Sequence, residues 1–381
     1  MIPAIRYESN QIRTTFDHPP EPEHSTMLAL DKLFPRKTLG FFPSPIHKLE
    51  RLSAMLGVEV WAKRDDVSSG LAFGGNKIRK LEWLVADALA KGCDTLVSIG
   101  NIQSNHTRQV CAAAAAVGMK SYTVQETWLE WDDPVYDKVG NILLTRIMGG
   151  NPIMGGYGYS TTEKDTWARA LEEVRAKGGK PYAIPAGASD HPLGGLGYAN
   201  FADEVAMQEQ QLGLFFDNIV VATCTGSTQA GMVVGFAAQE KRRRVIGIDT
   251  ADDEAMTRRA VTKIANDTSE LIASKGGKRV VVRDADIEII PDYSGPAYGL
   301  PSQQTIAAIR TAAEMEAMLT DPVYEGKSID GLIDMAKKGH FKGQRVLYAH
   351  LGGAPALNAY YKAFEDPENL TKLAREARYK E

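Results

Sequence analysis

A segment that joins a strong strand to a helix, residues 222–231 (ATCTGSTQAG), carries residue types that can hold an anion. It offers hydroxyl groups and the backbone N–H groups of a helix N-terminus, from Thr225, Gly226, Ser227 and Thr228. Such a site suits a phosphate. The segment lacks both the Gly-Lys-Ser/Thr ending of a Walker A loop and the G-x-G-x-x-G spacing of a dinucleotide site. Ordinary helix capping is the alternative interpretation.

Two further segments place polar or basic residues at the start of a helix. In residues 98–108 (SIGNIQSNHTR), Ser104 and Asn105 are good N-cap residues, and the free N–H groups behind them suit a carboxylate. In residues 73–80 (FGGNKIRK), Lys77 follows two glycines as a helix begins. The positive end of the helix dipole disfavours a charged lysine and favours a neutral amine, which can form a Schiff base. Simple capping and a solvated lysine are the alternatives.

Other chemistries find less support in the sequence. The 7 histidines show no metal-ligand spacing and the 3 cysteines form no C-x-x-C pair, so no metal site is expected. No G-x-S-x-G nucleophile elbow is present. Asp65 and Asp66 are expected to be solvated loop charges. In residues 321–328 (DPVYEGKS), Tyr324 stands beside Glu325, and spacing alone leaves a capped turn and an active-site tyrosine both open.

Alternating strands and helices are needed to position these segments. β-Branched runs predict strands at 95–100, 121–126, 181–187, 218–226, 245–250 and 345–353. Apolar periodicity predicts helices at 80–91, 107–118, 202–212 and 229–239. This alternation is typical of an α/β protein with a parallel sheet, in which ligands bind beyond the carboxyl ends of the strands. The glycine-rich residues 148–160 are expected to form a surface loop.

The composition is that of an ordinary globular chain. Its 381 residues exceed the length at which one hydrophobic core stops growing, so two lobes are expected. Lys and Arg number 44 against 48 Asp and Glu, and the net charge of −4 provides no positive field for nucleic acid or an anionic membrane. Residues 1–24 lack the apolar core of a signal peptide, and no apolar run approaches the roughly 18 residues of a membrane span. A cytoplasmic protein is therefore predicted.

Several longer motifs together resemble the fold-type II enzymes that use pyridoxal 5'-phosphate (PLP), which are similar to the tryptophan synthase beta chain. The resemblance is strongest to the 1-aminocyclopropane-1-carboxylate (ACC) deaminase and D-cysteine desulfhydrase group, and it covers residues 40–364. The motifs, in chain order, are SGLAFGGNKIRKLE, LVSIGNIQSNHTRQ, YAIPAGASDHPLGGLG, CTGSTQAGMVVGFA, GPAYGLP, LTDPVYEGKS and LYAHLGGAPALNAY.

The resemblance implies a two-domain α/β fold of parallel twisted sheets flanked by helices, with PLP in the cleft between the domains. The implied parts are an N-terminal extension at 1–25, a large PLP-binding domain at 26–79 plus 200–381, and a small inserted α/β domain at 80–199. A homodimer is implied as well.

The resemblance also implies a role in cofactor binding for several candidate residues. Lys77 would bind PLP covalently, Glu325 would face its pyridine nitrogen, and Asn105 would contact its phenolic oxygen. The phosphate group would be held by Lys80, Thr225, Gly226, Ser227 and Thr228.

Other candidates would face the substrate, which the resemblance implies is a small amino acid. Tyr298 and Tyr324 would be the active-site tyrosines, Leu351 would line the pocket, and Lys77 would act as the base. The substrate carboxylate would be held by Ser104, Asn105 and His106.

The implied reaction opens the ring of ACC to give 2-oxobutanoate and ammonia. ACC has no hydrogen on Cα, so the ring must open by attack on a methylene carbon or by removal of a methylene proton. A tyrosine whose pKa is lowered by the cationic cofactor is expected to attack or to assist.

Four departures from the deaminase pattern keep a second activity open. Glu325 and Leu351 match the deaminase branch, whereas His106 is the residue that the desulfhydrase branch carries. The other departures are Asn101, Ala188 in place of a cysteine, and Ser302–Gln304 in place of Asn-Glu-Gly. The alternative activity is that of a D-cysteine desulfhydrase-like lyase, which eliminates the β-substituent of an amino acid. A non-catalytic phosphate-binding protein is a third hypothesis.

Overall fold

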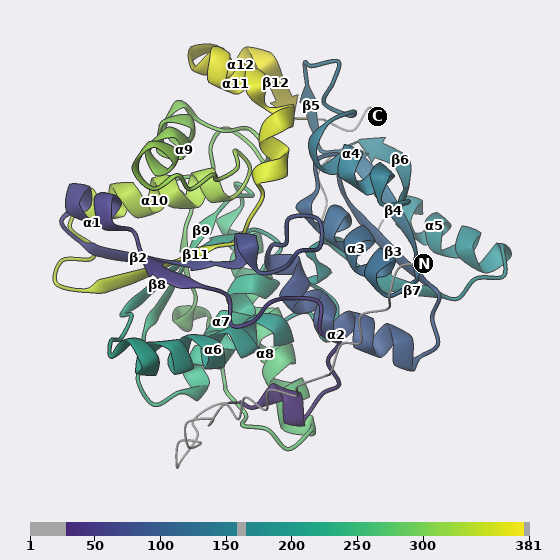
Figure 1. The fold of residues 1–381 in the computed structure, drawn as a ribbon, viewed down its shortest axis with the longest axis horizontal. Helices are drawn as coiled ribbons and strands as arrows, with labels where there is room; N and C mark the ends of the chain where they lie inside the picture. The colour runs from purple at the N-terminus through teal and green to yellow at the C-terminus, as the bar shows by residue number, and fades with distance from the viewer. Residues whose placement is uncertain (1–27, 158–164, 377–381) are drawn as a thin grey trace, which may run out of the picture.

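The computed structural model describes residues 28–157 and 165–376 and contains two large β-sheets, with helices packed on both (Figure 1). The α/β class and the parallel sheets predicted from the sequence are confirmed. The predicted extension at residues 1–25 lies outside the described residues.

The larger sheet has 6 strands in the order β1-β2-β11-β8-β9-β10. β1 is antiparallel to β2, and the other neighbouring strands are parallel. The bounds are β1 (Ile46–Lys48), β2 (Glu59–Arg64), β8 (Asn218–Thr223), β9 (Arg244–Asp249), β10 (Glu288–Ile290) and β11 (Arg345–His350).

The smaller sheet has 4 parallel strands in the order β6-β4-β3-β7, and a 2-stranded antiparallel sheet joins β5 to β12. The bounds are β3 (Thr95–Asn101), β4 (Lys120–Thr127), β5 (Leu129–Trp131), β6 (Asn151–Tyr157), β7 (Pro181–Ile184) and β12 (Ala374–Glu376).

Helices connect successive strands and cover the sheets. Their bounds are α1 (Glu50–Leu56), α2 (Asn76–Ala90), α3 (Asn105–Ala116), α4 (Gly140–Ile147), α5 (Asp165–Ala176), α6 (Leu196–Leu212), α7 (Ser227–Ala238), α8 (Glu254–Ser274), α9 (Gln303–Glu316), α10 (Glu325–Lys337), α11 (Tyr361–Glu365) and α12 (Leu370–Leu373). None of the helices in the described part of the chain is long and apolar enough to cross a membrane.

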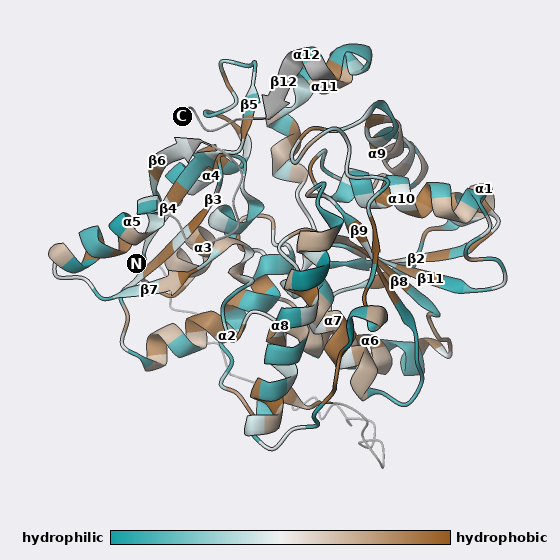
Figure 2. Ribbon diagram, turned by 180° about the vertical axis from the view of Figure 1, so that it is seen from behind, coloured by the Kyte–Doolittle hydropathy of each residue, from teal (hydrophilic) through white to brown (hydrophobic). Residues whose placement is uncertain are grey.

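The central strands are buried on both faces, which explains their continuous apolar runs. Along β11, Leu347 and Ala349 pack in the core under α6, α7 and α8, whereas Val346 and Tyr348 pack in the core under α1, α9 and α10. This alternation follows from the two-residue repeat of a strand. Figure 2 shows β8 and α7 largely in hydrophobic brown, as expected for elements enclosed by others.

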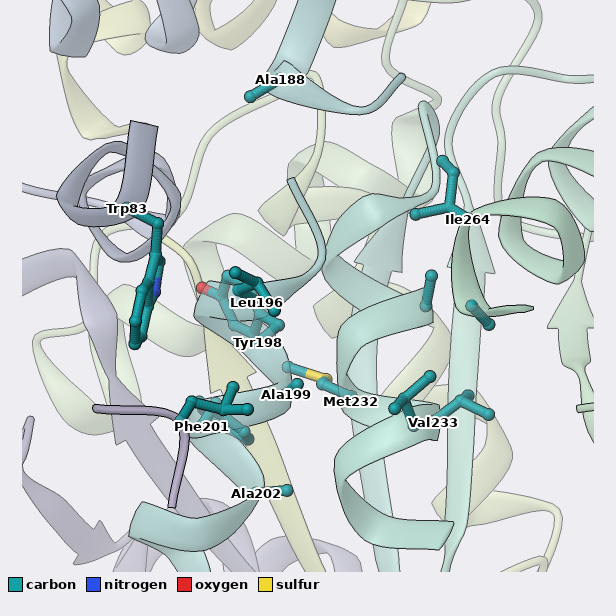
Figure 3. Packing of buried hydrophobic residues seen from close by; sticks show 14 of the residues in the cluster. Trp83, Ala188, Leu196, Tyr198, Ala199, Phe201, Ala202, Met232, Val233 and Ile264 are labelled. Carbon is teal, nitrogen blue, oxygen red and sulfur yellow. The ribbon is translucent and has the colours of Figure 1, made fainter. Parts of the chain in front are cut away.

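Helices α6 and α7 pack especially closely because glycines lie at their contact. Figure 3 shows Ala199 next to Met232 in the buried cluster that these helices share. A Cβ at Gly235 would lie 2.5 Å from the Ala199 carbonyl oxygen, and one at Gly231 would collide with the Gly195 carbonyl oxygen. The neighbouring Tyr198 is fully buried. This packing fixes the start of α7, which carries part of the predicted phosphate site.

The predicted strands and helices are all present, within a few residues at their ends. One prediction was wrong, because residues 151–157 of the expected glycine-rich loop form strand β6. β6 is an edge strand, and an edge strand tolerates Pro152, which has no backbone N–H to donate. Gly155 is required for this pairing, since its Cβ would lie 2.9 Å from Val124 Cγ1 on β4.

Asp65 was also predicted wrongly, because it is buried rather than solvated. Arg79 donates to Asp65 Oδ2 through Nε at 2.7 Å and to Glu204 Oε2 through Nη1 at 2.8 Å. Lys63 also pairs with Glu204. The four side chains form a buried network of charges that joins β2, α2 and α6. Asp66 is only partly exposed and pairs with Arg64 at 2.6 Å.

Candidate active site

One pocket is lined by residues that follow strands of both large sheets, as expected for ligands at the carboxyl ends of parallel strands. Most of the predicted site residues lie on its wall: Lys77, Ser104, Asn105, His106, Thr225, Gly226, Thr228, Tyr298, Tyr324, Glu325 and Leu351. The structure therefore brings together side chains that lie far apart in the chain, from Lys77 to Leu351. Lys80 and Ser227 are buried next to the pocket wall instead.

The Lys77 amine is placed for chemistry by the first turn of α2. Lys77 Nζ donates to Asn76 Oδ1 at 3.0 Å, and Asn76 Nδ2 in turn donates to Thr228 Oγ1 at 3.3 Å. Burial lowers the pKa of the Lys77 amine to about 8. Part of the amine is therefore neutral near neutral pH, as a lysine that must attack a carbonyl group requires.

The predicted phosphate site is built where α7 begins. Gly226 takes φ +92° just before the helix, a conformation that favours glycine. Lys80 Nζ donates to Ser227 Oγ at 2.7 Å and to the Gly187 carbonyl oxygen at 3.1 Å. Ser189 Oγ donates to Thr225 Oγ1 at 2.6 Å and was missed by sequence reasoning.

Among the described residues, no carboxylate pairs with the Lys80 amine, whose partners are the Ser227 hydroxyl and the Gly187 carbonyl oxygen, so a positive charge on it has no anionic partner. Burial, together with the nearby Lys77, lowers the pKa of Lys80 well below its ordinary value. A phosphate group at the α7 N-terminus would supply the missing negative charge, so these residues fit the phosphate of PLP.

The segment after β3 combines capping with access to the pocket. Ser104 Oγ accepts from the Thr107 backbone N–H at 3.2 Å and so caps α3, as the simpler interpretation predicted. Asn105 Oδ1 accepts from Asn141 Nδ2 at 2.9 Å. Asn141 belongs to α4 and was not predicted, because nothing in its local sequence links it to Asn105.

His106 is a neutral side chain in this pocket. It is buried, and burial with the positive charges of Lys77 and Lys80 holds its pKa well below the ordinary value. Ser98 Oγ donates to the Ile184 carbonyl oxygen at 2.9 Å, so the His106 Nε2–H at 2.8 Å is the donor to Ser98 Oγ.

Tyr298 and Tyr324 share a hydrogen bond between their hydroxyl groups. Burial, and next the neighbouring Tyr324, raise the pKa of Tyr298 well above its ordinary value. The protein's own groups therefore do not lower the pKa of Tyr298. A lowered value would require positive charge from a bound cofactor or substrate.

The Glu325 carboxylate has one satisfied and one unsatisfied oxygen. Oε2 accepts from the Tyr348 hydroxyl at 2.9 Å and from the Leu351 N–H at 3.0 Å, and it lies 3.2 Å from His350 Nδ1. Oε1 is buried and has no hydrogen-bond partner among the residues that the structure describes. A protonated pyridine nitrogen would supply the missing donor, so this carboxylate fits the ring of PLP.

The segment at 321–328 contains both the capped turn and the pocket tyrosine that its spacing left open. Asp321 Oδ1 accepts from the backbone N–H groups of Val323 and Tyr324 at 2.8 and 3.0 Å, and Oδ2 accepts from that of Glu325 at 3.2 Å. Asp321 was missed as a site residue, although its place at the start of a turn was the available signal. Within the described residues, no group of three His, Cys, Asp or Glu side chains could hold a metal ion.

Residues 37–352 match the family described as pyridoxal-phosphate dependent enzyme. The chain belongs to this family. Among its relatives, an ACC deaminase of Burkholderia vietnamiensis is 57% identical over 336 residues, which cover 87% of this chain and 98% of the relative. An ACC deaminase of Rhizobium leguminosarum bv. viciae is 55% identical over 342 residues, which cover 89% of this chain and 100% of the relative.

Solved structures agree with the assignment to the pyridoxal-phosphate dependent enzymes. A crystal structure of an ACC deaminase homologue matches with a TM-score of 0.76 and 33% identity, covering 92% of this chain and 100% of that one. A threonine deaminase isoform from Solanum lycopersicum matches with a TM-score of 0.57 and 16% identity, covering 88% of this chain and 84% of that one. The second match shows the fold alone.

Proposed function

We propose that this PLP-dependent enzyme opens the ring of ACC and releases 2-oxobutanoate and ammonia, with water consumed in the overall reaction. The observation that carries the proposal is the buried Glu325, which lines the same pocket as Lys77 and whose Oε1 has no partner among the described residues. A carboxylate facing the pyridine nitrogen would favour the carbanion chemistry that ring opening needs. Identities of 55–57% to ACC deaminases over nearly their whole lengths support the same activity.

The cofactor would be held by the residues already placed around the pocket. Lys77 would bind it, Asn105 would contact its phenolic oxygen, and Glu325 would face its pyridine nitrogen. The phosphate group would be held by Lys80, Thr225, Gly226, Ser227 and Thr228. When bound, PLP supplies an electron sink for the bonds around the substrate Cα.

The protein would orient the substrate through its carboxylate. Ser104, Asn105 and His106 lie at the N-terminus of α3, where backbone N–H groups favour an anion. His106 is neutral, so it would contact the substrate without adding charge. Leu351 would line the pocket near the cyclopropane ring and exclude water.

Proton movement would be shared between Lys77 and the tyrosine pair. The neutral Lys77 Nζ would accept a proton, because its pKa of about 8 lies near the working range of a general base. Tyr298 would be a proton donor or a hydrogen-bond donor while its pKa stays raised, and a nucleophile only where the charge of the bound cofactor lowers that pKa. Tyr324 shares its hydroxyl proton with Tyr298 and would act in the same relay.

The departures from the deaminase pattern weigh little against this activity, because only one of them lines the pocket. His106 does so, whereas Asn101, Ala188 and Ser302–Gln304 are not on its wall. Ala188 is fully buried, and Ser302 caps α9. A β-eliminating lyase acting on D-cysteine remains the second candidate, because His106 is the residue that resembles that branch.

The experiment that tests these activities offers the PLP-loaded protein ACC and D-cysteine separately. We expect 2-oxobutanoate and ammonia from ACC, with a lower kcat/KM for sulfide release from D-cysteine. Sulfide without any 2-oxobutanoate would reject the deaminase in favour of the lyase. A colourless protein that binds no PLP would reject both, and loss of the PLP absorbance in Lys77→Ala would exclude a non-catalytic phosphate-binding protein.

We also propose the domain division, the oligomeric state and the compartment. A small domain at 80–199 is supported by the smaller sheet, whose 4 strands all fall within that range. The strands of the 6-stranded sheet fall within 26–79 and 200–381. A homodimer and a cytoplasmic location rest on the family resemblance. Light scattering of the purified protein would test the homodimer.

A further inference from the structure

The orientation of the Glu325 carboxylate is set almost entirely by the end of strand β11. The Tyr348 hydroxyl, the His350 ring and the Leu351 N–H all lie within hydrogen-bond distance of Oε2. Because these groups converge on one oxygen, Oε1 is left without a partner among the described residues, and Glu325 itself lines the pocket. The geometry of the predicted pyridine contact therefore depends partly on Tyr348 and His350, which do not line the pocket.

His350 stands between two carboxylates. Its ring is fully buried, with Nδ1 at 3.2 Å from Glu325 Oε2 and Nε2 at 3.7 Å from Asp66 Oδ2. The Gly352 N–H also points at Nδ1, but at 3.5 Å this contact is weaker than the one to Glu325. We therefore assign the hydrogen bond of Nδ1 to the Glu325 carboxylate. Nδ1 thus has an acceptor within hydrogen-bond distance, whereas Nε2 has no hydrogen-bond partner among the described residues and meets Asp66 only at ion-pair distance. Two carboxylates on opposite sides of the ring favour its doubly protonated form.

Asp66 is held in turn by Arg64. Arg64 donates to Asp66 Oδ1 through Nε at 2.8 Å and to Oδ2 through Nη2 at 2.6 Å. Arg64, Asp66, His350 and Glu325 thus form a row of charged side chains that ends at the pocket. The outer end of this row is only partly exposed, since the Arg64 and Asp66 side chains are 21% and 17% exposed. His47 Nε2 lies 3.1 Å from Arg64 Nη1 and ends the row.

The charges along this row alternate in sign. Arg64 and His350 would be positive, and Asp66 and Glu325 negative, up to the pocket. Burial by itself would lower the pKa of His350, but the hydrogen bond to Glu325 and the charges of Asp66 and Glu325 raise it above its ordinary value, against an opposing effect of Arg64. Tyr348, the other titratable group against the ring, is kept as a phenol because burial and Glu325 raise its pKa.

We propose that His350 and Asp66 are positioning residues for the cofactor: as a cation held by Asp66, His350 fixes Glu325 so that its Oε1 carries a full negative charge to the pyridine nitrogen. The inference rests on the proposed function, because it requires PLP to bind with its ring nitrogen at Glu325. Neither residue touches the reacting atoms. Their effect is to keep the pyridine nitrogen protonated and so to strengthen the electron sink.

Two substitutions separate the charge of this row from its shape. His350→Asn keeps a donor close to the Nδ1 position but removes the positive charge. Asp66→Asn keeps the shape of the side chain and removes the negative charge that holds His350 protonated. Because Asp66 is less buried than His350, this variant replaces His350→Asn if the latter fails to fold. His340→Asn, on an exposed turn, is the matched control. Glu325→Gln is the reference for losing the carboxylate itself.

The main measurement is the protonation of the pyridine nitrogen in each holoenzyme, followed by NMR with ¹⁵N-labelled PLP across pH. For His350→Asn we expect the pKa of that nitrogen to fall by at least about one unit and kcat for ACC to fall by about tenfold, with KM changed less than about twofold. Asp66→Asn should shift the nitrogen pKa in the same direction by a smaller amount. His340→Asn should match the unmodified enzyme.

An unchanged nitrogen titration in both His350→Asn and Asp66→Asn would overturn the inference, even if the variants melt at lower temperature, because that pattern marks a merely structural role. The NMR measurement needs no substrate, so it tests the inference separately from the activity. If the nitrogen pKa falls in the two variants but the unmodified enzyme does not turn over ACC, only the proposed activity is rejected. If even Glu325→Gln leaves the nitrogen unchanged, the placement of PLP is wrong and both proposals fail together.

Discussion

The side-chain oxygen of Gln109 accepts a hydrogen bond from the backbone N–H of Lys77 at 3.0 Å, and it also accepts from the next N–H along α2 at 3.2 Å. This contact joins α3, which carries the predicted substrate loop, to the turn that presents the reactive amine. A Cβ at Gly75 would lie within 2.9 Å of the same amide, so the two helices meet here at close range. The lysine is therefore positioned from outside its own helix.

Replacing Gln109 by leucine removes an acceptor from two N–H groups in the first turn of α2. We expect Gln109→Leu to lower the free energy of unfolding by roughly 2 kcal/mol, because the Lys77 N–H loses its acceptor, whereas the Ile78 N–H keeps the Gly75 carbonyl oxygen at 3.1 Å. PLP affinity should fall as well, since the Lys77 backbone loses its anchor. Urea unfolding and PLP titration measure the two effects. Gln211→Leu on the exposed side of α6 is the control, and equal losses in both variants would contradict the role given to Gln109.

The pH dependence of cofactor capture follows from the pKa of Lys77, which burial lowers to about 8. Only the neutral amine can attack the PLP aldehyde, so the amine becomes competent as pH rises through that value. We expect the rate of holoenzyme formation from apoprotein and PLP to rise between about pH 7 and 9 and then level off. Stopped-flow absorbance measures this rate. A plateau reached only near pH 10 would show that the pocket does not lower the pKa of Lys77.

Replacing Glu325 by serine tests the pyridine contact by activity. Glu325→Ser should still bind PLP, because Lys77 and the phosphate site are unchanged. Turnover of ACC should fall by about 100-fold or more, since the charge opposite the ring nitrogen is lost. Steady-state kinetics and PLP titration measure the two properties. Unchanged kcat for ACC would refute the role of Glu325.

Replacing His106 by glutamine tests whether the one departure in the pocket wall controls specificity. His106→Gln should fold normally, because the glutamine amide can still donate to Ser98 Oγ. We expect the ratio of kcat/KM for ACC to that for D-cysteine to increase. Both substrates are assayed on the same preparation, and Asn101→Gly, a departure away from the pocket, serves for comparison. An unchanged ratio would show that this residue does not choose the substrate.

Acid sensitivity should arise at the buried charge network. Despite burial, which raises it, the pairing of Glu204 with Arg79 and Lys63 lowers its pKa from 4.5 to about 2. Because the folded-state value lies below the unfolded one, this stabilisation is present above about pH 5 and is lost as pH falls towards 2. Glu204→Gln should cost about 3–5 kcal/mol at neutral pH and flatten this part of the profile. Denaturant unfolding across pH measures both, and a profile as steep as that of the unmodified protein would contradict the assignment.

Local sequence determined the elements of this fold because each strand and helix has its own periodicity. The run at 218–226 is apolar without interruption, which is typical of a strand buried on both faces, and β8 is such a strand. Strand β6 could not be predicted in the same way. Its glycines resemble those of a loop, and only the close packing of Gly155 against Val124 and Glu126 on β4 shows why that one is needed.

The chemistry-bearing residues were also visible in the sequence, since Lys77, Glu325 and Thr225 stand in motifs whose residue types suit their tasks. The partners that tune them were not visible, because they come from distant parts of the chain. Asp65 resembles a surface charge in the sequence, but in the fold it is buried and pairs with Arg79. The sequence by itself determined which groups could react, whereas the tertiary structure decided their protonation and direction, because both depend on burial and on contacts that only folding creates.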